Sequence, residues 1–296
     1  MIIKNITVAI CTYKRPLLLE KCIESVLSQV TSFPYDILVV DNDVEKTAEK
    51  IVQKYKTVQY YSQSIKGLSN ARNMAVSKSN CEFIVFIDDD EFADVDWLTN
   101  MVNCQQKFSA DVVLGKVIYK IPDHFPSYIK KSSFFIRKER TTGEVANVND
   151  GYTGNTLVNR KFFDLRNPCF LEEFNHTGGE DSEFFNFLLS RQAKIVFSNE
   201  AVIYETQDNK RLKISWFYKR GYRSGYNYSS HLVENNNFFI AYIKILYSFL
   251  GGLVLSLILI FKTIFSPNVY LIKAIAKIGN QLGKIGYLCG FQIKNY

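Results

Sequence analysis

The sequence predicts an α/β fold with a mostly parallel β-sheet flanked by helices, followed by a C-terminal, membrane-associated helical tail. Over residues 1–96, short β-branched and aromatic runs alternate with segments of helical periodicity. Polar clusters follow these runs at the points where the strands are expected to end. Residues 210–296 are apolar and rich in lysine, and they contain only one acid, Glu234.

Composition limits the class of protein. The chain has 296 residues, 47% of them hydrophobic, and a formal net charge of +7. This predicts one large domain with an appended segment and argues against disorder. Residues 210–296 carry 12 lysines and arginines. A segment that is both basic and apolar favours an anionic membrane surface. Nucleic acid is not expected as a partner, because no basic groove with interleaved stacking aromatics is present.

Cysteine usage and the N-terminus suggest the compartment. Six cysteines are scattered without a Cys-x-x-Cys pair, which argues against a zinc site and against a disulfide framework. The first ten residues alternate as in a strand, with no apolar stretch before a small-residue cleavage site. We therefore expect no signal peptide and a catalytic body in the cytoplasm.

The elements of the first part follow in order. Strands are predicted at residues 6–10, 36–40, 58–61 and 83–87, and helices at 17–30, 45–55 and 68–77. Such alternation implies parallel strands with ligands beyond their carboxyl ends.

Beyond residue 96 the pattern is mixed. Strands are predicted at residues 112–119, 156–158 and 194–204, and a glycine hinge leads into a short helix within 178–191. The basic interval 127–142 stays unassigned, as an ordinary loop or as a flap over an acceptor.

Three consecutive carboxylates, Asp88, Asp89 and Asp90, follow the predicted strand at 83–87. Each ionised carboxylate raises the cost of ionising its neighbour, and a divalent cation such as Mg²⁺ or Mn²⁺ removes that repulsion. Taken alone, the cluster fits either a solvated acidic turn or a metal site that also binds a diphosphate.

Five motifs occur in a family-like order. They are residues 12–16 (Thr-Tyr-Lys-Arg-Pro), 39–42 (Val-Val-Asp-Asn), 67–73 (Gly-Leu-Ser-Asn-Ala-Arg-Asn), the acids at 88–90, and 179–181 (Gly-Glu-Asp). With this order and spacing, residues 4–226 resemble family 2 glycosyltransferases of the Rossmann-like GT-A fold, of the bacterial surface-polysaccharide type. Each motif alone is a weak signal.

The resemblance implies roles in nucleotide binding. Asp41 would hydrogen-bond the base, and Thr12, Tyr13 and Arg15 would surround the nucleoside. Arg72 would lie near the diphosphate, and Asp88 would face the ribose. Ordinary alternatives remain: Asp41 could simply end a strand, and Arg72 could pair with a surface acid.

The resemblance also implies the chemistry. Asp90 would bind the metal, with Asp89 as a helper, and Asp181 would be the catalytic base. One base and a direct displacement imply inversion at the anomeric carbon. Glu180 and Glu183 are the alternative bases. Because Asp181 is expected at a helix start, the helix dipole is expected to lower its pKa.

Two features around the last strand qualify the match. Ile203-Tyr204-Glu205 stands where many relatives carry a histidine that completes the metal shell, so the third ligand is unassigned. Residues 216–226 resemble an arginine-rich helix in which Arg220 and Arg223 reach the pyrophosphate. A basic face on lipid headgroups is the alternative for these two arginines.

The tail contains two different segments. Residues 245–261 form 17 positions without a charge, about 26 Å of helix, which could span a bilayer or lie shallowly in it. In residues 269–291, one stripe carries Lys273, Lys277 and Lys284, which indicates an interfacial helix. Another stripe, of Gly279, Gly283, Gly286 and Gly290, would permit close helix packing or would simply weaken the helix. A soluble C-terminal cap is the alternative.

We therefore expect a metal-dependent, inverting glycosyltransferase of hexosyltransferase type, with domains at residues 1–230 and 231–296. It would move a sugar from a nucleotide-sugar donor to a cell-surface glycan, which the tail suggests is lipid-linked. The expected location is the cytoplasmic face of the bacterial inner membrane, peripheral or single-pass. The alternatives are a nucleotidyltransferase that makes nucleotide sugars and an inactive membrane-bound scaffold. The glycine-free loop at 12–16 disfavours the nucleotidyltransferase.

Overall fold

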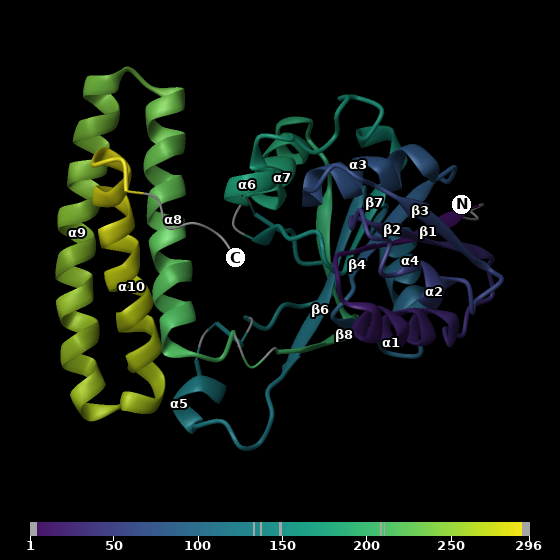
Figure 1. The fold of residues 1–296 in the computed structure, drawn as a ribbon, viewed down its shortest axis with the longest axis horizontal. Helices are drawn as coiled ribbons and strands as arrows, with labels where there is room; N and C mark the ends of the chain where they lie inside the picture. The colour runs from purple at the N-terminus through teal and green to yellow at the C-terminus, as the bar shows by residue number, and fades with distance from the viewer. Residues whose placement is uncertain are drawn as a thin grey trace. The chain divides into compact units, whose positions relative to one another are not determined.

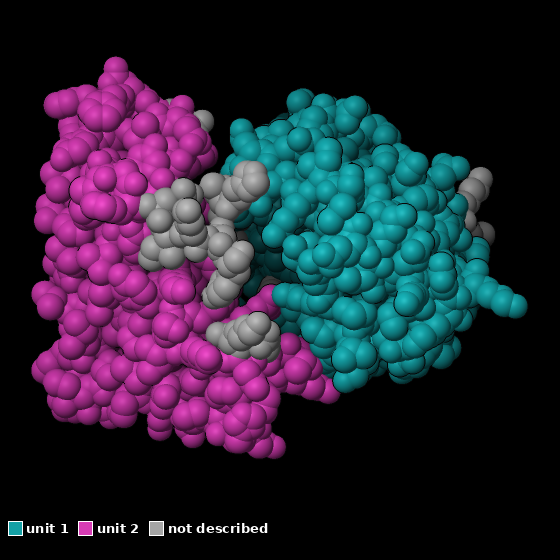
Figure 2. Space-filling view, viewed as in Figure 1, with its two compact units in different colours: residues 1–118, 138–205 teal, residues 119–137, 206–296 magenta. Residues whose placement is uncertain are grey.

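The computed structural model describes residues 5–291, with the exception of Ser133, Arg137, Val148, Asn149, Asp208 and Lys210. The chain divides into two compact units, coloured separately in Figure 2. Unit 1 comprises Met1–Ile118 and Lys138–Glu205, and unit 2 comprises Tyr119–Arg137 and Thr206–Tyr296. The predicted functional boundary after residue 230 falls within helix α8 (Ile214–Asn235) of unit 2 and stays a prediction.

Unit 1 is built on an eight-stranded sheet with the order β3-β2-β1-β4-β7-β6-β8-β5 (Figure 1). The strands are β1 (Ile6–Thr12), β2 (Tyr35–Asp41), β3 (Val58–Ser62), β4 (Phe83–Asp88), β5 (Glu91–Ala93), β6 (Val112–Lys120), β7 (Thr156–Asn159) and β8 (Ile195–Thr206). Strands β3, β2, β1 and β4 pair in parallel, whereas β7 is antiparallel to both β4 and β6. The predicted α/β class is confirmed, with a mixed sheet whose parallel part comes from the N-terminal third of the chain.

The helices of unit 1 connect these strands: α1 (Pro16–Leu27), α2 (Glu49–Val52), α3 (Leu68–Lys78), α4 (Trp97–Phe108), α6 (Phe174–Thr177) and α7 (Glu180–Ser190). The 3-10 turn η2 covers Arg160–Phe162. The predicted helices at 17–30, 68–77 and within 178–191 are confirmed. The predicted helix at 45–55 is wrong in extent, because the Asp41 carboxylate accepts hydrogen bonds from the backbone N–H groups of Asp43 and Ala48 and holds this segment as a loop.

Several elements lie outside the predicted set: β5, α4, α6 and the short helix α5 (Ser127–Lys130). Strand β5 pairs antiparallel with β8 and places Glu91 opposite Glu205, a tertiary pairing that a local pattern cannot indicate. Helix α4 buries Trp97, Leu98 and Met101 at helical spacing. The apolar face of this helix can therefore be recognised in the sequence by its helical spacing.

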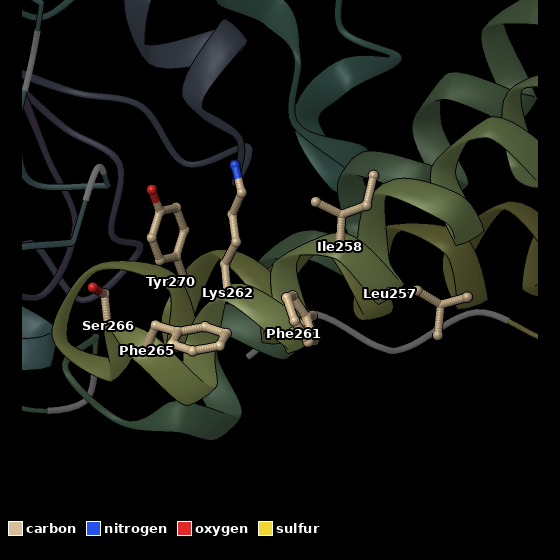
Figure 3. A pocket seen from close by; sticks show the side chains of 7 residues that line it. All are labelled: Leu257, Ile258, Phe261, Lys262, Phe265, Ser266 and Tyr270. Carbon is tan, nitrogen blue, oxygen red and sulfur yellow. The ribbon is translucent and has the colours of Figure 1, made fainter.

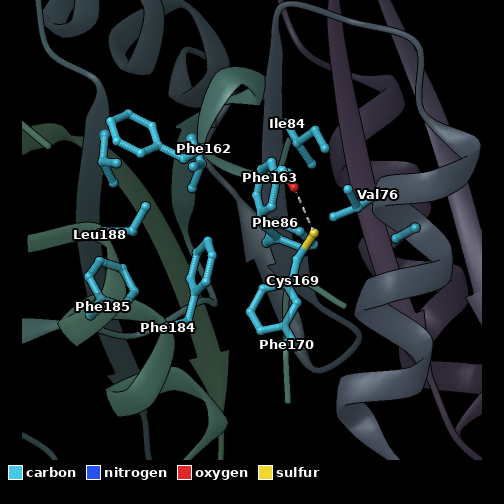
Figure 4. Packing of buried hydrophobic residues seen from close by; sticks show 14 of the residues in the cluster. Val76, Ile84, Phe86, Phe162, Phe163, Cys169, Phe170, Phe184, Phe185 and Leu188 are labelled. Atoms are coloured by element: carbon cyan, nitrogen blue, oxygen red, sulfur yellow. Dashed lines mark hydrogen bonds between the residues drawn. The ribbon is translucent and has the colours of Figure 1, made fainter. Parts of the chain in front are cut away.

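An aromatic cluster fixes helix α7 against strand β4 (Figure 4). Phe86 of β4 packs edge-on against Phe163 and Phe170, at centroid distances of 6.1 and 5.9 Å. Phe184 of α7 stacks on Phe163 with centroids 5.4 Å apart. Fully burying one aromatic side chain contributes roughly 1.5–3 kcal/mol. The cluster therefore holds the N-terminus of α7 in a defined position relative to β4.

Unit 2 is helical. It consists of the short helix α5 (Ser127–Lys130) and of α8, α9 (Phe238–Phe265) and α10 (Pro267–Leu288), and α10 packs against both α8 and α9 (Figure 1). A small core joins the segment around α5 to α8 and α10 through Phe135, Phe217 and Ile272.

Glycines bring α8 and α10 into backbone contact. A Cβ atom at Gly225 of α8 would lie 1.9 Å from the carbonyl oxygen of Asn280, and one at Gly283 of α10 would lie 1.9 Å from the carbonyl oxygen of Tyr222. Gly279 and Gly286 make comparably close approaches to α8, whereas Gly290 has no such neighbour within 4 Å. Close helix packing through the predicted glycine stripe is thus confirmed for its first three members.

The predicted lysine stripe is wrong at Lys284. Its ammonium group donates to the carbonyl oxygen of Ser248 at 3.0 Å, to the Ser248 hydroxyl at 2.8 Å and to Gln281 Oε1 at 3.1 Å. Ser248 belongs to α9. This helix covers the part of α10 that carries Lys284, and so the lysine is buried. Helical geometry alone could not indicate the covering helix.

Helix α9 is the one helix of the described chain that is long and apolar enough to cross a membrane. Only a narrow stripe of Ala241, Ile245, Gly252 and Ser256 is buried, and large apolar side chains are exposed over much of the remaining surface. Soluble proteins rarely expose so large an apolar surface, which marks α9 as an interaction surface.

Replacing Gly283 by alanine should destabilise unit 2, because the new methyl group meets a backbone carbonyl that cannot move without separating α8 from α10. Overpacking of this kind costs about 1–3 kcal/mol. Thermal unfolding in detergent should show a lower Tm for Gly283→Ala. The same substitution at Gly251, where nothing lies within 4 Å, serves as the control and should leave the Tm unchanged or raise it. Equal Tm values for the two variants would contradict the packing.

Candidate active site

The carboxyl ends of β1, β2 and β4 meet at one edge of the sheet. Thr12 is paired in register with Asp41, and Cys11 is paired with Asp88. Ligands of parallel α/β sheets bind beyond this edge. The structure therefore brings together three of the predicted groups: the loop after β1, the end of β2 and the acid cluster.

Arg15 joins the loop after β1 to the acid cluster. Its Nη1 donates to Asp89 Oδ1 and to Asp90 Oδ2, each at 3.0 Å. The Thr12 hydroxyl donates to Asp89 Oδ2 at 2.7 Å. Burial raises the pKa of Asp89 to about 6, while Arg15 and Thr12 act in the opposite direction. One arginine therefore compensates two neighbouring carboxylates.

The acid cluster is larger than the three predicted residues. The buried Glu91 accepts a hydrogen bond from the backbone N–H of Asp88 at 2.8 Å. Burial, together with the charges of Asp88 and Glu205, raises the pKa of Glu91 well above its usual range. Asp88 itself keeps 45% of its side chain exposed. Glu91 was missed although it is the fourth consecutive acid of the sequence, because its neighbour Glu205 comes from β8.

Arg72 connects the acid cluster to α7. Its Nη1 lies 2.7 Å from Asp181 Oδ1 and 3.0 Å from Glu180 Oε1, and its Nη2 lies 3.7 Å from Asp88 Oδ1. The guanidinium lies over the Phe170 ring, 5.7 Å from its centroid. Burial lowers the pKa of Arg72, but the charges of the three surrounding carboxylates outweigh this effect and raise the pKa overall. Arg72 therefore contacts both Asp181, the predicted base, and Asp88, the acid predicted to face the ribose.

Asp181 is the second residue of α7, as predicted, and follows Gly179 with its positive φ of 106°. Its Oδ1 also accepts a hydrogen bond from the Thr153 hydroxyl. Burial raises the pKa of Asp181, an effect that Arg72 opposes and Glu180 increases. The expected lowering by the helix dipole is therefore wrong, because desolvation outweighs it. With 32% of its side chain exposed against 11% for Glu180, Asp181 is the more accessible of the two acids.

Asp41 has a structural task in this conformation. Its Oδ2 accepts hydrogen bonds from the Ala48 N–H at 2.8 Å and from the Tyr60 hydroxyl at 3.2 Å, and its Oδ1 accepts one from the Asp43 N–H at 3.1 Å. The residue is fully buried. The neighbouring Asp43 is also buried, and its Oδ2 has no hydrogen-bond partner within the described part of the chain. Base recognition by Asp41 stays a prediction and requires some of these bonds to open.

Tyr13 and the two arginines of α8 complete the set of predicted residues. The Tyr13 ring is exposed, and the ammonium groups of Lys66 and Lys14 lie 4.7 and 5.8 Å from its centroid. Arg220 lies over Trp216 in unit 2, 5.1 Å from the ring centroid. Arg223 also belongs to α8, and the contact of both arginines with pyrophosphate stays a prediction.

The segment before β7 supplies residues that the sequence did not indicate. Thr153 is buried and contacts Asp181, and a Cβ at Gly154 would lie 2.9 Å from Glu91 Oε1 and 3.1 Å from Asp88 Oδ2. A larger residue at this position would require these carboxylates to shift. The small polar run at 153–155 before a strand is the available signal, but its partners come from distant segments.

The donor set fits a divalent cation that shares its shell with a ligand. Among the described residues, no group of three or more His, Cys, Asp or Glu side chains is arranged to hold a metal by itself. However, Mg²⁺ commonly binds one or two carboxylates and completes its shell with water and substrate phosphates. The acids of residues 88–91 provide such oxygen donors, and Asp88 is accessible.

The sheet topology and these residues define a nucleotide-sugar transferase of the GT-A class. The family described as “Glycosyl transferase family 2” matches residues 7–166, more than half of the chain. The chain belongs to this family and is a glycosyltransferase, in agreement with the resemblance of the sequence motifs. Family membership also argues against the nucleotidyltransferase alternative.

Three curated relatives illustrate what the chain is similar to. The chain is 29% identical to the succinoglycan biosynthesis protein ExoM of Rhizobium meliloti (strain 1021), over 78% of this chain and 76% of that protein. It is 22% identical to the hyaluronan synthase of Pasteurella multocida, over 61% of this chain and only 22% of that protein. For the poly(ribitol-phosphate) β-N-acetylglucosaminyltransferase TarP of Staphylococcus aureus (strain N315), the identity is 27%, over 38% of this chain and 36% of that protein.

Solved structures share the fold. S. aureus TarS 1–349 in complex with UDP-GlcNAc matches with a TM-score of 0.56 at 15% identity, over 97% of this chain and 92% of that chain. GalNAc-T7 with UDP, GalNAc and Mn²⁺ matches with a TM-score of 0.54 at 15% identity, over 69% of this chain and 44% of that chain. At these identities the likeness concerns the fold alone.

The raised pKa of Asp89 makes folding stability depend on pH. Its pKa of about 6 lies above the ordinary value of 3.8, so the folded protein retains a proton that the unfolded chain releases. This contribution is complete below about pH 4 and is lost as the pH rises through about 6. In urea unfolding at a series of pH values, the free energy of unfolding of the wild type minus that of Asp89→Asn should fall between pH 4 and pH 7. Parallel curves for the two proteins would contradict the buried position of this carboxyl.

Proposed function

We propose that this glycosyltransferase transfers a hexose, with inversion, from a UDP-sugar to a cell-surface glycan. The proposal is supported above all by the meeting of Arg72, Asp88 and Asp181 at the carboxyl edge of the sheet in a chain of family 2. The relatives ExoM, a succinoglycan biosynthesis protein, and TarP, a poly(ribitol-phosphate) transferase, support a polysaccharide acceptor. The UDP-GlcNAc complex of TarS supports the nucleotide.

The donor nucleotide is assigned to the loop after β1. The exposed Tyr13 ring, flanked by Lys14 and Lys66, suits a stacking contact with a base and attracts phosphate charge. Thr12 and Arg15 lie beside it in the chain and already hold the acid cluster. Asp88, exposed at the end of β4, is accessible for the ribose hydroxyls.

We assign the divalent metal, Mn²⁺ or Mg²⁺, to Asp90, with Asp88 or Asp89 as a second oxygen donor. When bound, the cation would neutralise negative charge on the departing diphosphate. Arg15 already forms an ion pair with Asp90 and Asp89, so it keeps these carboxylates close together before the donor binds. The structure of GalNAc-T7 with UDP, GalNAc and Mn²⁺ supports a metal in this fold.

Asp181 is the proposed base. Arg72 and Thr153 both donate to its Oδ1, which orients the carboxylate. In this proposal Oδ2 accepts the proton of the acceptor hydroxyl. The raised pKa of Asp181 makes it a stronger proton acceptor than an ordinary carboxylate. The acceptor oxygen then attacks the anomeric carbon from the face opposite the diphosphate, which inverts the configuration. Glu180, less exposed and bound to the same arginine, is a positioning residue.

The acceptor is proposed to be lipid-linked because α9 suits attachment to the cytoplasmic face of the inner membrane. We infer that α9 lies in the membrane plane. Helix α10 packs along it and in turn against α8, and these two helices carry charges such as Lys219, Arg223 and Lys273. A charged side chain costs roughly 2.5–3.5 kcal/mol at the bilayer centre. A spanning α9 would take these charges into the hydrocarbon.

The lysines of α9 support the same orientation. Lys244 and Lys262 are spaced so that about 100° per residue returns them to one side of the helix. Lys244 donates to Asn236 Oδ1 at 2.7 Å, and Lys262 lies over Tyr270 of α10. Both ammonium groups thus lean towards the other helices of unit 2, and the opposite side of α9 is apolar.

Purified protein should hydrolyse or transfer from one class of donor in a screen of UDP-, GDP- and dTDP-sugars with Mn²⁺, and EDTA should abolish the activity. Asp181→Asn should lower kcat by about 10²–10⁴, since general-base catalysis contributes this much. Donor and metal binding, measured by calorimetry, should persist in this variant.

Glu183→Gln is the matched control, because Glu183 lies within the same helix and pairs with Arg166 instead of Arg72. Its kcat should stay near that of the wild type. Undiminished transfer by Asp181→Asn would reject Asp181 as the base. Binding of a nucleotide without turnover of any donor would favour the inactive scaffold.

The orientation of α9 can be measured by cysteine labelling in sealed vesicles. Asn237→Cys and Asn268→Cys flank the helix and are introduced into Cys289→Ser, which removes the exposed cysteine. A membrane-impermeant maleimide should label both positions from the same side. Leu257→Cys, on the apolar side, should react only after detergent is added. Labelling of the two flanking positions from opposite sides would show that α9 spans the bilayer.

A further inference from the structure

A hollow of about 440 Å³ lies at the turn between α9 and α10 (Figure 3). Apolar side chains of α9, among them Leu257, Phe261 and Phe265, form much of its wall. Its polar atoms come from Lys262, Ser266 and Tyr270. The hollow thus combines an apolar wall with a cation and two hydroxyl groups. It belongs entirely to unit 2 and contains none of the residues of the candidate active site.

Two ammonium groups converge on one ring beside this hollow. The Nζ of Lys262 lies 5.5 Å and the Nζ of Lys273 5.8 Å from the centroid of Tyr270. No carboxylate of the described residues forms an ion pair with either lysine, and the single acid of residues 210–296 is Glu234, near the C-terminal end of α8. The local charge is therefore positive and favours an anion.

The start of α10 adds to this preference. Ser266 precedes Pro267, the first residue of a 22-residue helix, and its side chain makes no capping hydrogen bond. The positive end of a helix dipole and a nearby hydroxyl both favour a phosphate group. An anionic amphiphile meets all of these features, with its phosphate at the lysines and its chain along the apolar wall.

We propose that this hollow binds one anionic phospholipid of the bilayer. The phosphate lies at Lys262 and Ser266, with Lys273 nearby at the Tyr270 ring, and an acyl chain follows Leu257, Phe261 and Phe265 along α9. The inference rests on the proposed attachment of α9 to the membrane and adds a preference for anionic headgroups. A second copy of this chain is a poorer occupant, because the same face of the copy would oppose lysine with lysine.

The test uses the full-length protein and flotation with vesicles of phosphatidylcholine, with or without phosphatidylglycerol. The wild type should bind the anionic vesicles more tightly. Each lysine near an anionic surface is worth about 1 kcal/mol, so Lys262→Gln combined with Lys273→Gln should weaken this binding roughly 30-fold. The control is Lys244→Gln combined with Lys277→Gln, which also removes one lysine from α9 and one from α10 but lies outside the hollow. The control should lose clearly less affinity.

The outcomes separate this inference from the proposed function. Equal losses in the two double variants, or no preference for anionic vesicles, would overturn the site while leaving membrane attachment intact. Absence of binding to either vesicle would instead reject the attachment of α9. Transfer from a soluble donor, measured in detergent, should be the same in both double variants, and this shows that each is folded.

Soluble ligands distinguish the sources of the phosphate. In a Ser266→Cys variant that keeps Lys262 and Lys273, short-chain phosphatidylglycerol should slow the labelling of the new cysteine by maleimide. Inorganic phosphate should not slow it. Equal protection by inorganic phosphate would indicate a simple anion site and overturn the lipid assignment. Stronger protection by a polyprenyl phosphate would assign the hollow to the lipid-linked acceptor instead.

Discussion

One buried arginine links the acidic side chains of the candidate active site through ion pairs. Arg72 lies between carboxylates from two elements: Asp88 at the end of β4, and Glu180 and Asp181 at the start of α7. Burial raises the pKa of Asp181, and the positive charge of Arg72 opposes this rise. The aromatic cluster of Phe163, Phe170 and Phe184 packs the two elements together. Arg72 offsets the repulsion between the carboxylates that this packing brings close.

A second arginine, in the loop after β1, also forms ion pairs with two carboxylates. Arg15 compensates Asp89 and Asp90, so that the edge of the sheet carries two groups in which a guanidinium bridges carboxylates. In the proposed mechanism, these two groups would receive a donor that brings both a diphosphate and a divalent cation. The phosphates can attract the arginines while the cation takes the carboxylates, and little charge has to move when the donor binds.

Unit 2 follows a different physical rule. Its helices α8 and α10 approach through glycine backbones, and the buried Lys284 is satisfied by Ser248 and Gln281. Much of the surface of α9 remains apolar, and its lysines lean towards the other helices. The unit therefore separates its charges from its apolar surface, which is the arrangement expected at a boundary between lipid and water.

Sequence patterns are sufficient to predict the α/β alternation, the strand ends that carry Asp41 and Asp88, and the glycine stripe of α10. These features are local, since periodicity and turn residues act within a few positions. Other features depend on contacts between distant segments: the Asp41 carboxylate closes its own loop, Arg72 pairs with Asp181, and Thr153 and Lys284 bond to residues far along the chain. Burial also reversed the expected direction of the Asp181 pKa. The physical reason is that desolvation and ion pairing depend on what surrounds a group in space, which a linear pattern does not contain.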